Sequence, residues 1–217
     1  VGGKVYTDGG TFGGLYAFDE ATGSQLFFNN ALEQYDQWSA TWSGSSVLTF
    51  LVGNLRAHDL LSGSILWTTP VPWQFSGYSM RSFFVVANGK VFVVVPPKLH
   101  AIDLTIHTIV WSASNSYTAA PAVAGGVLFA IDSGTLIALD AATGQFQWTF
   151  IGDGKLEFAP IVANGHVYVA SRQNAYAVEI ATQTQVWTAA VGGPLSIASR
   201  RLLIATTDAV HAYVMSK

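Results

Sequence analysis

The chain has 217 residues, of which 50% are hydrophobic and 11% are charged. This composition excludes an intrinsically disordered chain, which combines low hydrophobicity with high charge. Thirteen acidic and ten basic side chains give a net charge of −3, and no run of Lys and Arg suggests a phosphate-binding surface, which argues against a nucleic-acid partner. No apolar run reaches the length of about 18 residues that a membrane-spanning helix requires. Without cysteine, the chain can form neither disulfides nor thiolate metal sites.

A repeated phrase organises the chain. Five copies occupy residues 15–27, 55–67, 99–111, 136–148 and 175–187, and a remnant closes the chain. The central alanines are 40, 44, 37, 39 and 35 residues apart and are Ala17, Ala57, Ala101, Ala138, Ala177 and Ala212. Two residues after each of the first five comes an acid, in the order Asp19, Asp59, Asp103, Asp140 and Glu179. Ten residues after each comes a ring, in the order Phe27, Trp67, Trp111, Trp148 and Trp187.

Short strands separated by turn signals fill each copy. In chain order, the clearest strands are expected at residues 5–7, 91–95, 120–124, 127–131, 135–140, 145–150 and 167–170. Turns are expected at Ala-Thr-Gly and Ala-Asn-Gly, which occur at residues 21–23, 87–89, 142–144 and 163–165. Four strands per roughly 40 residues predict an all-β fold, a β-propeller of four-stranded blades with about five and a half repeats. The expected single domain covers residues 1–217, with repeats at approximately 1–44, 45–88, 89–125, 126–164, 165–199 and a partial 200–217.

The repeated residues have structural roles. The acid is expected to cap the tight turn that follows it, and the glycine supplies the positive φ of that turn. The turns after Asp103 and Glu179 lack this glycine and are expected to be degraded. The ring at the end of the phrase is expected to pack between blades.

The phrase Ala-x-Asp-x-x-Thr-Gly-x-x-x-Trp at 138–148 resembles the tryptophan-docking repeat of PQQ-type propellers. That family includes quinoprotein alcohol dehydrogenases, the non-enzymatic scaffold lipoprotein of bacterial outer-membrane assembly, and fungal PQQ-like repeat proteins. The resemblance covers nearly the whole chain. It implies the propeller fold and says little about activity, because one fold hosts many functions.

The two ends of the chain do not complement one another. The first copy starts at its second strand, and the last copy stops after its third. The chain also begins with Val rather than Met. We expect a piece of a longer propeller. The alternatives are a six-bladed ring with two incomplete terminal blades and self-association of two chains that complete one another's terminal blades.

Two long loops hold the candidate ligand-binding residues. The loops that join an outermost strand to the next innermost strand gather on one face, and the longest are expected at residues 29–37 and 69–80. The candidates on this face are Tyr35, Asp36, Trp38, Trp73 and Tyr78. The third loop of this kind carries Tyr117, the fourth carries Asp153, Lys155 and Glu157, and the shorter turns on the same face include Arg172 and Asn174. Aromatic rings beside polar side chains suit a glycan or a protein ligand. The alternative is that these rings only close the mouth of the channel, while Trp42 is expected in the core.

No catalytic or metal-binding constellation is expected. Asp8, Asp132 and Asp208 are interpreted as turn residues, with calcium binding as the alternative. His58, His100 and His211 are interpreted as strand or interface histidines, with zinc as the alternative. The resemblance implies that a catalytic member holds PQQ against a disulfide of adjacent cysteines and holds calcium through Glu, Asn and Asp. This chain has no cysteine, so we expect no cofactor.

The sequence therefore predicts a non-catalytic binding or scaffold propeller that recognises a glycan or protein ligand through its inter-blade loops. The alternative is a quinoprotein dehydrogenase relative or fragment that depends on PQQ. The low Lys content and the abundance of Gly, Ser and Thr favour a secreted or periplasmic protein.

Overall fold

The structure, a computed structural model, describes residues 2–9, 13–32, 40–73 and 83–215. Within these ranges the chain forms strands and turns and no helix, which confirms the all-β prediction. Accordingly, no described helix could cross a membrane. The chain divides into two compact units, Val1–Val91 with Ile102–Ile109 and Phe92–Ala101 with Val110–Lys217.

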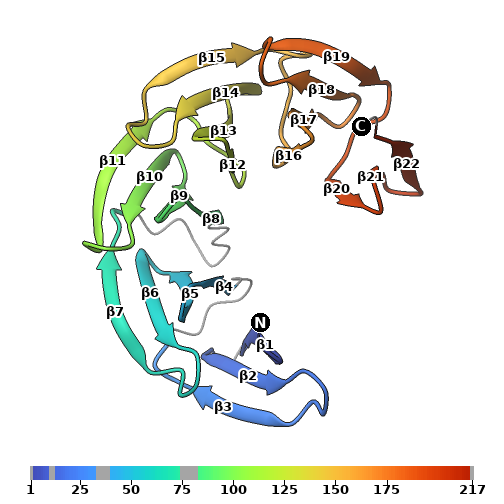
Figure 1. The fold of residues 1–217 in the computed structure, drawn as a ribbon. Coiled ribbons are helices and arrows are strands. Elements are labelled where there is room, and N and C mark those ends of the chain that lie inside the picture. Colours follow the sequence, from blue (N-terminus) through green and yellow to red (C-terminus); the bar gives the residue numbers. More distant parts are fainter. Residues whose placement is uncertain (1, 10–12, 33–39, 74–82, 216–217) are drawn as a thin grey trace. The chain divides into compact units, whose positions relative to one another are not determined.

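The first unit contains two antiparallel sheets, and each follows the order of the chain (Figure 1). The first sheet has three strands, β1 (Lys4–Asp8), β2 (Leu15–Asp19) and β3 (Gln25–Asn29). The second has four strands, β4 (Thr41–Ser43), β5 (Ser46–Leu51), β6 (Asn54–Asp59) and β7 (Ile65–Pro70). A third sheet contributes residues to both units, with strands β8 (Phe83–Ala87), β9 (Lys90–Val95), β10 (Lys98–Asp103) and β11 (Thr108–Ser114).

The second unit contains three further sheets of the same kind. One has the strands β12 (Ala122–Ala124), β13 (Val127–Asp132), β14 (Thr135–Asp140) and β15 (Phe146–Phe150). The next has β16 (Ile161–Ala163), β17 (His166–Ala170), β18 (Ala175–Glu179) and β19 (Thr184–Ala189). The last has three strands, β20 (Leu195–Ala198), β21 (Arg201–Ala205) and β22 (Val210–Val214). The four strands predicted at 120–124, 127–131, 135–140 and 145–150 match β12–β15 to within two residues.

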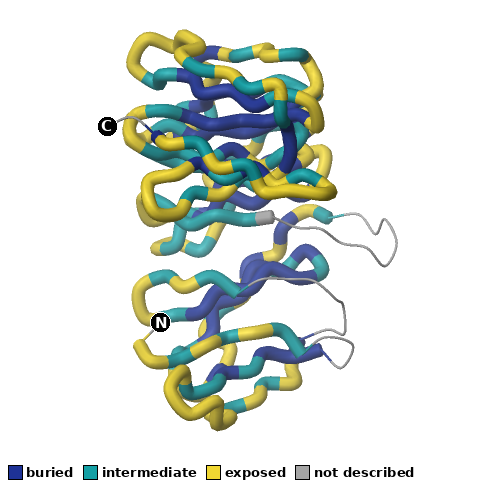
Figure 2. The backbone as a smooth tube through the Cα atoms, turned by 90° about the vertical axis from the view of Figure 1, so that its right-hand side faces the viewer, coloured by how far each residue is buried: buried dark blue, intermediate teal, exposed yellow. Residues whose placement is uncertain are grey.

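The two central strands of each four-stranded sheet form the core. Strands such as β9, β13 and β14 have four or more consecutive buried residues, whereas β11 alternates between exposed and half-buried positions. Figure 2 shows this as buried central segments flanked by exposed turns. Strands that are covered on both faces favour apolar residues at successive positions, which explains the runs of Val, Leu, Ile and Ala.

The repeat alanine lies opposite the repeat ring. Alanine and ring are register partners in four sheets, as Ala17–Phe27, Ala57–Trp67, Ala138–Trp148 and Ala177–Trp187. The pairing shifts immediately after each of these alanines. A β-bulge of this kind bends the strand locally and re-aims the side chains beside it, and the small alanine leaves space for the ring across the ladder.

The rings also reach the next repeat. A Cβ atom added to Gly63 would lie 2.3 Å from the Phe27 ring, and one added to Gly144 would lie 2.7 Å from the Trp111 ring. Trp111 Nε1 donates a hydrogen bond to the carbonyl oxygen of Ala141 at 3.3 Å. In these two cases one aromatic side chain joins a repeat to the repeat that follows it.

The predicted acid caps are present. The Oδ1 atom of Asp140 accepts hydrogen bonds from the amides of Ala142 and Thr143, at 2.9 and 2.8 Å. These and the hydroxyl of Thr143 lower the pKa of the Asp140 carboxyl. The same pattern of two amide donors repeats at Asp19, Asp59 and Asp103.

The expectation that two turns are degraded is wrong. His107 and Gln183 adopt φ angles of 56° and 60°, close to the 75° of Gly144 at the equivalent position. Their amides donate to the carbonyl oxygens of Asp103 and Glu179, at 2.9 and 2.8 Å. The turn therefore keeps its geometry without glycine, because its hydrogen bonds stabilise a conformation that costs a non-glycine residue about 1–2 kcal/mol.

The expectation that Trp42 belongs to the core is also wrong. Its side chain is 50% exposed. Trp42 lies in the short first strand of its sheet, β4, and the equivalent Val86 and Val162 are only partly buried. The alignment of Trp42 with Val86 and Val162 predicted that its side chain is buried. Strand β4, however, lies at the margin of its sheet and is less covered than the central strands β5 and β6.

Candidate functional site

Most of the predicted binding residues fall outside the described part of the chain. Tyr35, Asp36, Trp38 and Tyr78 belong to this group. Trp73 is described and is partly buried beside the turn between β5 and β6. A Cβ atom on Gly53 of that turn would lie 2.8 Å from Trp73 Cβ. The structure thus places Trp73 against its own sheet, and the five candidates as a group stay a prediction.

The third of the predicted loops holds a structural tyrosine. Tyr117 is buried, and it forms a bridge with Asp132. Burial, with a smaller effect of the Asp132 charge, raises the pKa of the Tyr117 phenol to about 12. The Asp132 Oδ1 atom accepts a hydrogen bond from the amide of Ser116 at 2.9 Å. These contacts position the loop and leave the phenol neutral at physiological pH.

The loop between β15 and β16 is built around a carboxylate. Asp153 Oδ2 accepts hydrogen bonds from Ser171 Oγ at 2.6 Å and from Asn174 Nδ2 at 2.9 Å. Burial opposes ionisation of Asp153, but these hydrogen bonds outweigh it and lower the pKa of the carboxyl. Asp153 therefore fastens its loop to the turn between β17 and β18.

An ion pair crosses the same two segments. Arg172 Nε lies 2.7 Å from Glu157 Oε1, as a charge contact rather than an aligned hydrogen bond. The Arg172 side chain is 80% exposed. The amides of Glu157 and Phe158 approach the carbonyl oxygen of Ala170 at 3.1 and 3.3 Å. This backbone contact holds Glu157 where it can orient the guanidinium.

A glycine pair brings a third segment against this turn. A Cβ atom on Gly192 would lie 2.1 Å from the carbonyl oxygen of Ser171, and one on Gly193 would lie 2.0 Å from that of Ala205. The backbone therefore approaches both neighbours more closely than any side chain allows. The segment between β19 and β20 is wedged between the ends of β17 and β21.

These segments enclose two cavities that share Arg172. The larger, of about 500 Å³, is lined by Phe158, Arg172, Gly192, Gly193, Pro194, Ala205, Thr206 and Thr207. The smaller, of about 260 Å³, is lined by Lys155, Glu157, Ser171, Arg172 and Gln173. Both lie within the second unit. Their volumes approach or fall within the range of small-molecule sites, about 300–1,000 Å³.

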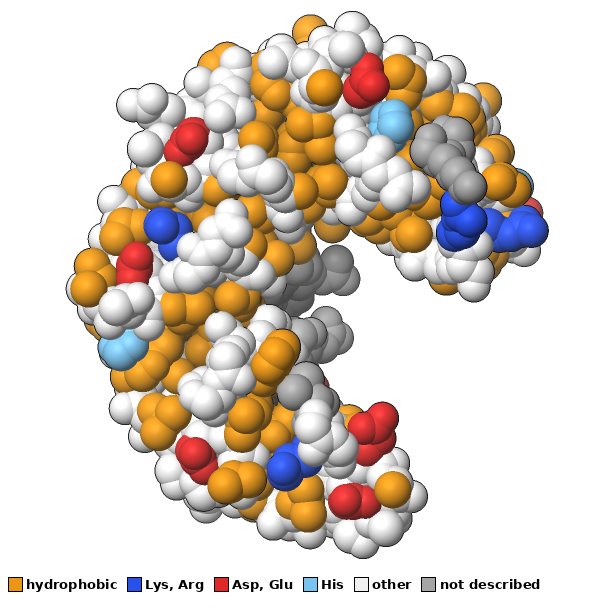
Figure 3. All heavy atoms as spheres, in the orientation of Figure 1, with side chains coloured by type: hydrophobic (Ala, Val, Ile, Leu, Met, Phe, Trp, Pro, Cys, Tyr) orange, Lys and Arg blue, Asp and Glu red, His pale blue; other side chains and the backbone are white. Residues whose placement is uncertain are grey.

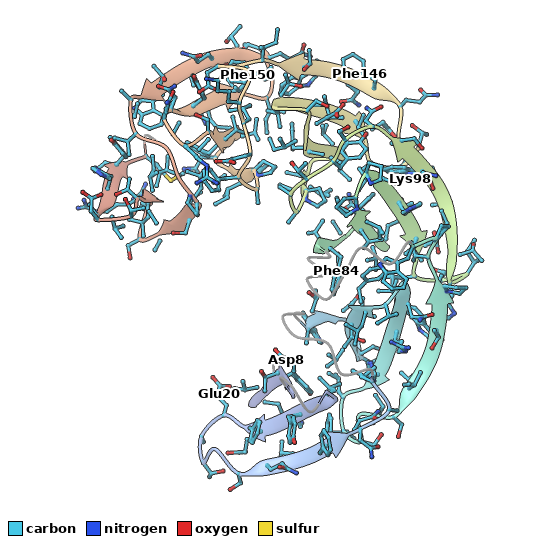
Figure 4. The ribbon with its side chains drawn as sticks, turned by 180° about the vertical axis from the view of Figure 1, so that it is seen from behind. Asp8, Glu20, Phe84, Lys98, Phe146 and Phe150 are labelled. Atoms are coloured by element: carbon cyan, nitrogen blue, oxygen red, sulfur yellow. The ribbon has the colours of Figure 1, made fainter. Side chains whose placement is uncertain are left out.

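Phe158 joins the larger cavity to the core. Its side chain packs against the buried cluster that includes Tyr168 and Leu202. Phe150 on β15 (Figure 4) makes an edge-to-face contact with Tyr176, with ring centroids 5.4 Å apart. Packing within the protein thus fixes the aromatic side chains near this loop.

Sequence reasoning anticipated part of this site. It placed Asp153, Lys155, Glu157, Arg172 and Asn174 on the loop face, and the structure brings all five to adjoining segments. It did not single out Gly192 and Gly193 or the threonines at 206 and 207. The available signal was a Gly-Gly-Pro sequence at 192–194 between two expected strands.

The histidines are engaged in the strands. His58 is fully buried, with Nδ1 3.0 Å from the carbonyl oxygen of Gly63 and Nε2 3.0 Å from Thr49 Oγ1. Burial lowers the pKa of His58 and also that of His100. The described residues include no group of three or more His, Cys, Asp or Glu side chains able to hold a metal ion.

The charge distribution is dispersed. Figure 3 shows acidic and basic side chains scattered among uncharged ones on the face that it presents. A nucleic-acid-binding surface requires clustered positive charge. This face does not offer it.

Comparisons with known proteins identify the repeat. A family model described as outer membrane protein assembly factor BamB matches residues 51–154 and 98–215. The crystal structure of BamB from Moraxella catarrhalis superposes with a TM-score of 0.73 and 18% identity, over 96% of this chain and 69% of that chain. This likeness shows the β-propeller fold.

Two curated proteins also resemble the chain. Lupanine 17-hydroxylase [cytochrome c] from a Pseudomonas species is 32% identical over 122 residues, covering 45% of this chain and 18% of that protein. The serine/threonine-protein kinase AfsK from Streptomyces griseus is 27% identical over 169 residues, covering 72% of this chain and 20% of that protein. The chain thus spans about a fifth of the length of the curated relatives that it matches. On the family match, which extends over more than half of its residues, the chain belongs to the PQQ-like β-propeller repeat family described as outer membrane protein assembly factor BamB.

Proposed function

We propose that the chain is a non-catalytic binding or scaffold propeller that recognises a glycan or protein ligand through its inter-blade loop face. The observation that carries this proposal is the pair of adjoining cavities that share Arg172. Loops and turns form most of both cavities, and these loops and turns connect the strands of the second unit. Binding residues are commonly placed on loops that a rigid scaffold positions.

The same kind of loop occurs in the first unit. Phe158 of the larger cavity aligns with Trp38 in the repeat, so the loops at 29–38 and 69–80 are equivalent to the loop at 151–160. Tyr35, Asp36, Trp38, Trp73 and Tyr78 therefore stay part of the proposed ligand-binding face. The family description, which names an assembly factor, supports a protein ligand as one of the two classes.

The test is a binding screen followed by substitution. The purified chain is applied to a glycan array and to an array of folded proteins and peptides. Each hit is then measured with Arg172→Gln, Trp38→Ala and Trp73→Ala, after circular dichroism has established that each variant is folded. Loss of binding in at least one variant is expected. If neither array gives a hit, or if every variant binds as the parent does, the proposed binding face is wrong.

The similarity to lupanine 17-hydroxylase favours one alternative, a quinoprotein relative that uses PQQ. The residues of this chain do not fit the expected site. There is no cysteine to form the disulfide lid, and the described residues assemble no calcium-binding group of three or more acidic or histidine side chains. The proposed function therefore involves no PQQ chemistry. Turnover above background in dye-linked alcohol oxidation, after reconstitution with PQQ and calcium, would support the alternative.

A second proposed contact is self-association at β22. Within the described residues β22 pairs only with β21, and Val210 and Val214 are 67% and 76% exposed. An open edge strand with apolar side chains can pair with another chain. Sedimentation velocity over a range of concentrations tests this contact. Val214→Lys should weaken association, whereas Leu61→Lys, an exposed control in a turn of the first unit, should not.

The location proposed for the protein is secreted or periplasmic. The composition favours it, and the family description refers to assembly of outer-membrane proteins. Fractionation of the native host, with the chain detected by antibody, is the corresponding test. Recovery in the cytoplasmic fraction would contradict it.

A further inference from the structure

We propose that Arg172 binds the carboxylate of an acidic sugar, a hexuronate unit of a glycan, in the larger cavity. The inference rests on the binding function proposed above and specifies its ligand. Among the described residues, Glu157 is the one partner of the Arg172 guanidinium, and it makes a charge contact with Nε. The terminal amino groups of Arg172 stay available, and a planar guanidinium can bind a carboxylate through two parallel hydrogen bonds.

Glu157 restrains the orientation of the Arg172 guanidinium. An exposed arginine samples many rotamers and loses that freedom on binding. The charge contact at 2.7 Å restrains the guanidinium from its Nε side, and the amide of Glu157 is tied to Ala170 at the end of β17. Arg172 is thereby partly ordered before the ligand arrives.

The glycine pair forms a close-packed floor beneath Arg172. Gly192 would place a Cβ atom 2.5 Å from the carbonyl carbon of Arg172 and 2.5 Å from the amide nitrogen of Gln173. A Cβ atom on Gly193 would lie 2.0 Å from the carbonyl oxygen of Ala205. Contact at backbone level on both sides fixes the distance between Arg172 and the segment at 205–207.

The remaining lining suits a sugar ring. Phe158 and Pro194 provide apolar surface, and Thr206 and Thr207 provide hydroxyl groups. The Thr206 hydroxyl is held by Asp208 Oδ1 at 2.8 Å and by the amide of Ala209 at 3.0 Å. A ring with an apolar face, hydroxyl groups and one carboxylate matches these three kinds of contact.

The shape of the cavity favours a glycan over an extended peptide. Its walls are turns and inter-strand connections, with Ala205 at the end of β21 the one lining residue that lies in a strand. An extended peptide is typically bound along a strand edge. A volume of about 500 Å³ accommodates a compact ring, and the smaller cavity offers Lys155 to a further carboxylate of a longer acidic glycan.

The experiment compares one charged probe with its neutral form. Tetragalacturonic acid and its fully methyl-esterified form are titrated into the chain by calorimetry at low and moderate salt. The acid form should bind at least about tenfold more tightly than the ester. Arg172→Gln should reduce affinity for the acid about tenfold or more, and Arg172→Lys should retain part of it, because Lys keeps the charge and loses the bidentate geometry.

A matched arginine provides the control. Arg201 is exposed, starts β21 and does not line either cavity. Arg201→Gln removes the same charge and should leave affinity unchanged. Equal binding of acid and ester, equal losses in Arg172→Gln and Arg201→Gln, or no binding of the acid would each overturn the acidic-sugar assignment.

A second arm separates this inference from the broader proposal. A short peptide with two adjacent aspartates, an acetylated N-terminus and an amidated C-terminus presents carboxylates without a sugar. Binding of this peptide in preference to tetragalacturonic acid, lost in Arg172→Gln, would replace the sugar with a protein ligand and retain the loop-face function. A glycan or protein hit from the arrays that binds equally to the parent and to Arg172→Gln would retain a binding function at another site. Absence of any array hit would remove the proposed function itself.

Discussion

The indole of Trp67 stacks on the imidazole of His107, with ring centroids 4.3 Å apart and planes 18° from parallel. Both residues belong to the first unit. Phe27 and Trp111 meet a glycine at the equivalent position of the following repeat. His107 therefore replaces glycine with a ring that contacts the neighbouring repeat, and it does so in a left-handed conformation with φ of 56°. The Thr69 hydroxyl adds a hydrogen bond to the carbonyl oxygen of His107 at 2.8 Å.

The stacking on Trp67 predicts that His107 contributes more to stability than Gln183, which occupies the same turn position in another repeat. His107→Ala should destabilise the chain by about 1 kcal/mol, the typical contribution of a stacked pair beyond burial. Gln183→Ala is the matched control, because Gln183 is exposed at the same turn position with φ of 60°. Urea denaturation measures both. A loss for Gln183→Ala as large as that for His107→Ala would show that the turn, rather than the stacking, is responsible.

The tryptophans should differ sharply in their contribution to stability. Trp148 is 8% exposed and contacts Phe129 edge to face, with centroids 5.8 Å apart. Trp148→Ala should cost about 3–5 kcal/mol, as usual for a large buried ring. Trp73→Ala should cost far less, and Trp42→Ala, at a position 50% exposed, should cost about 1 kcal/mol or less. Similar denaturation midpoints for all three variants would contradict this ranking.

Gly192 should tolerate no side chain. Gly192→Ala would force a Cβ atom into backbone atoms at 2.1–2.5 Å, so we expect a loss of at least about 2 kcal/mol. Gly125→Ala is the control, because its φ is 57° and a Cβ atom there meets nothing within 4 Å. That change should cost about 1 kcal/mol from backbone conformation alone. Thermal or urea unfolding of the two variants gives the comparison, and a smaller loss for Gly192→Ala would refute the close-packed floor.

Stability should fall as pH decreases below neutrality. Burial lowers the pKa of His58 and of His100 in the folded state, whereas the unfolded chain protonates histidine near pH 6.5. Below that pH the unfolded state binds more protons, so folding is progressively disfavoured until the pH reaches the folded-state pKa. The effect is absent above about pH 7.

Removal of the titrating group tests this pH dependence. The free energy of unfolding is measured from pH 7.5 to 5 for the parent and for His58→Gln. The slope with pH should be smaller in the variant, whatever its stability at pH 7.5. Parallel curves for the parent and His58→Gln would contradict the prediction.

Local sequence was sufficient for the strands and turns. The alternation of β-branched runs with Gly-containing turns placed β12–β15 to within two residues, because strand preference and turn geometry depend on neighbouring residues. The acid caps at Asp19, Asp59 and Asp140 were also predictable, since donor and acceptor lie two or three residues apart. Period and composition together predicted an all-β propeller. The resemblance of the phrase at 138–148 to a known repeat indicated the PQQ-like family, and the family comparison confirms that assignment.

Sites that depend on distant segments were beyond local inference. The exposure of Trp42 depends on what covers an innermost strand, and the partner of His107 is a tryptophan forty residues earlier in the chain. The cavities around Arg172 need four segments, at 151–160, 171–174, 190–194 and 205–207, to come together. Gly192 and Gly193 permit that meeting, but a glycine pair in a sequence does not say which carbonyl oxygens it will approach. Repetition along the chain therefore specified the architecture, whereas packing between segments distant in sequence positioned the residues of the candidate site.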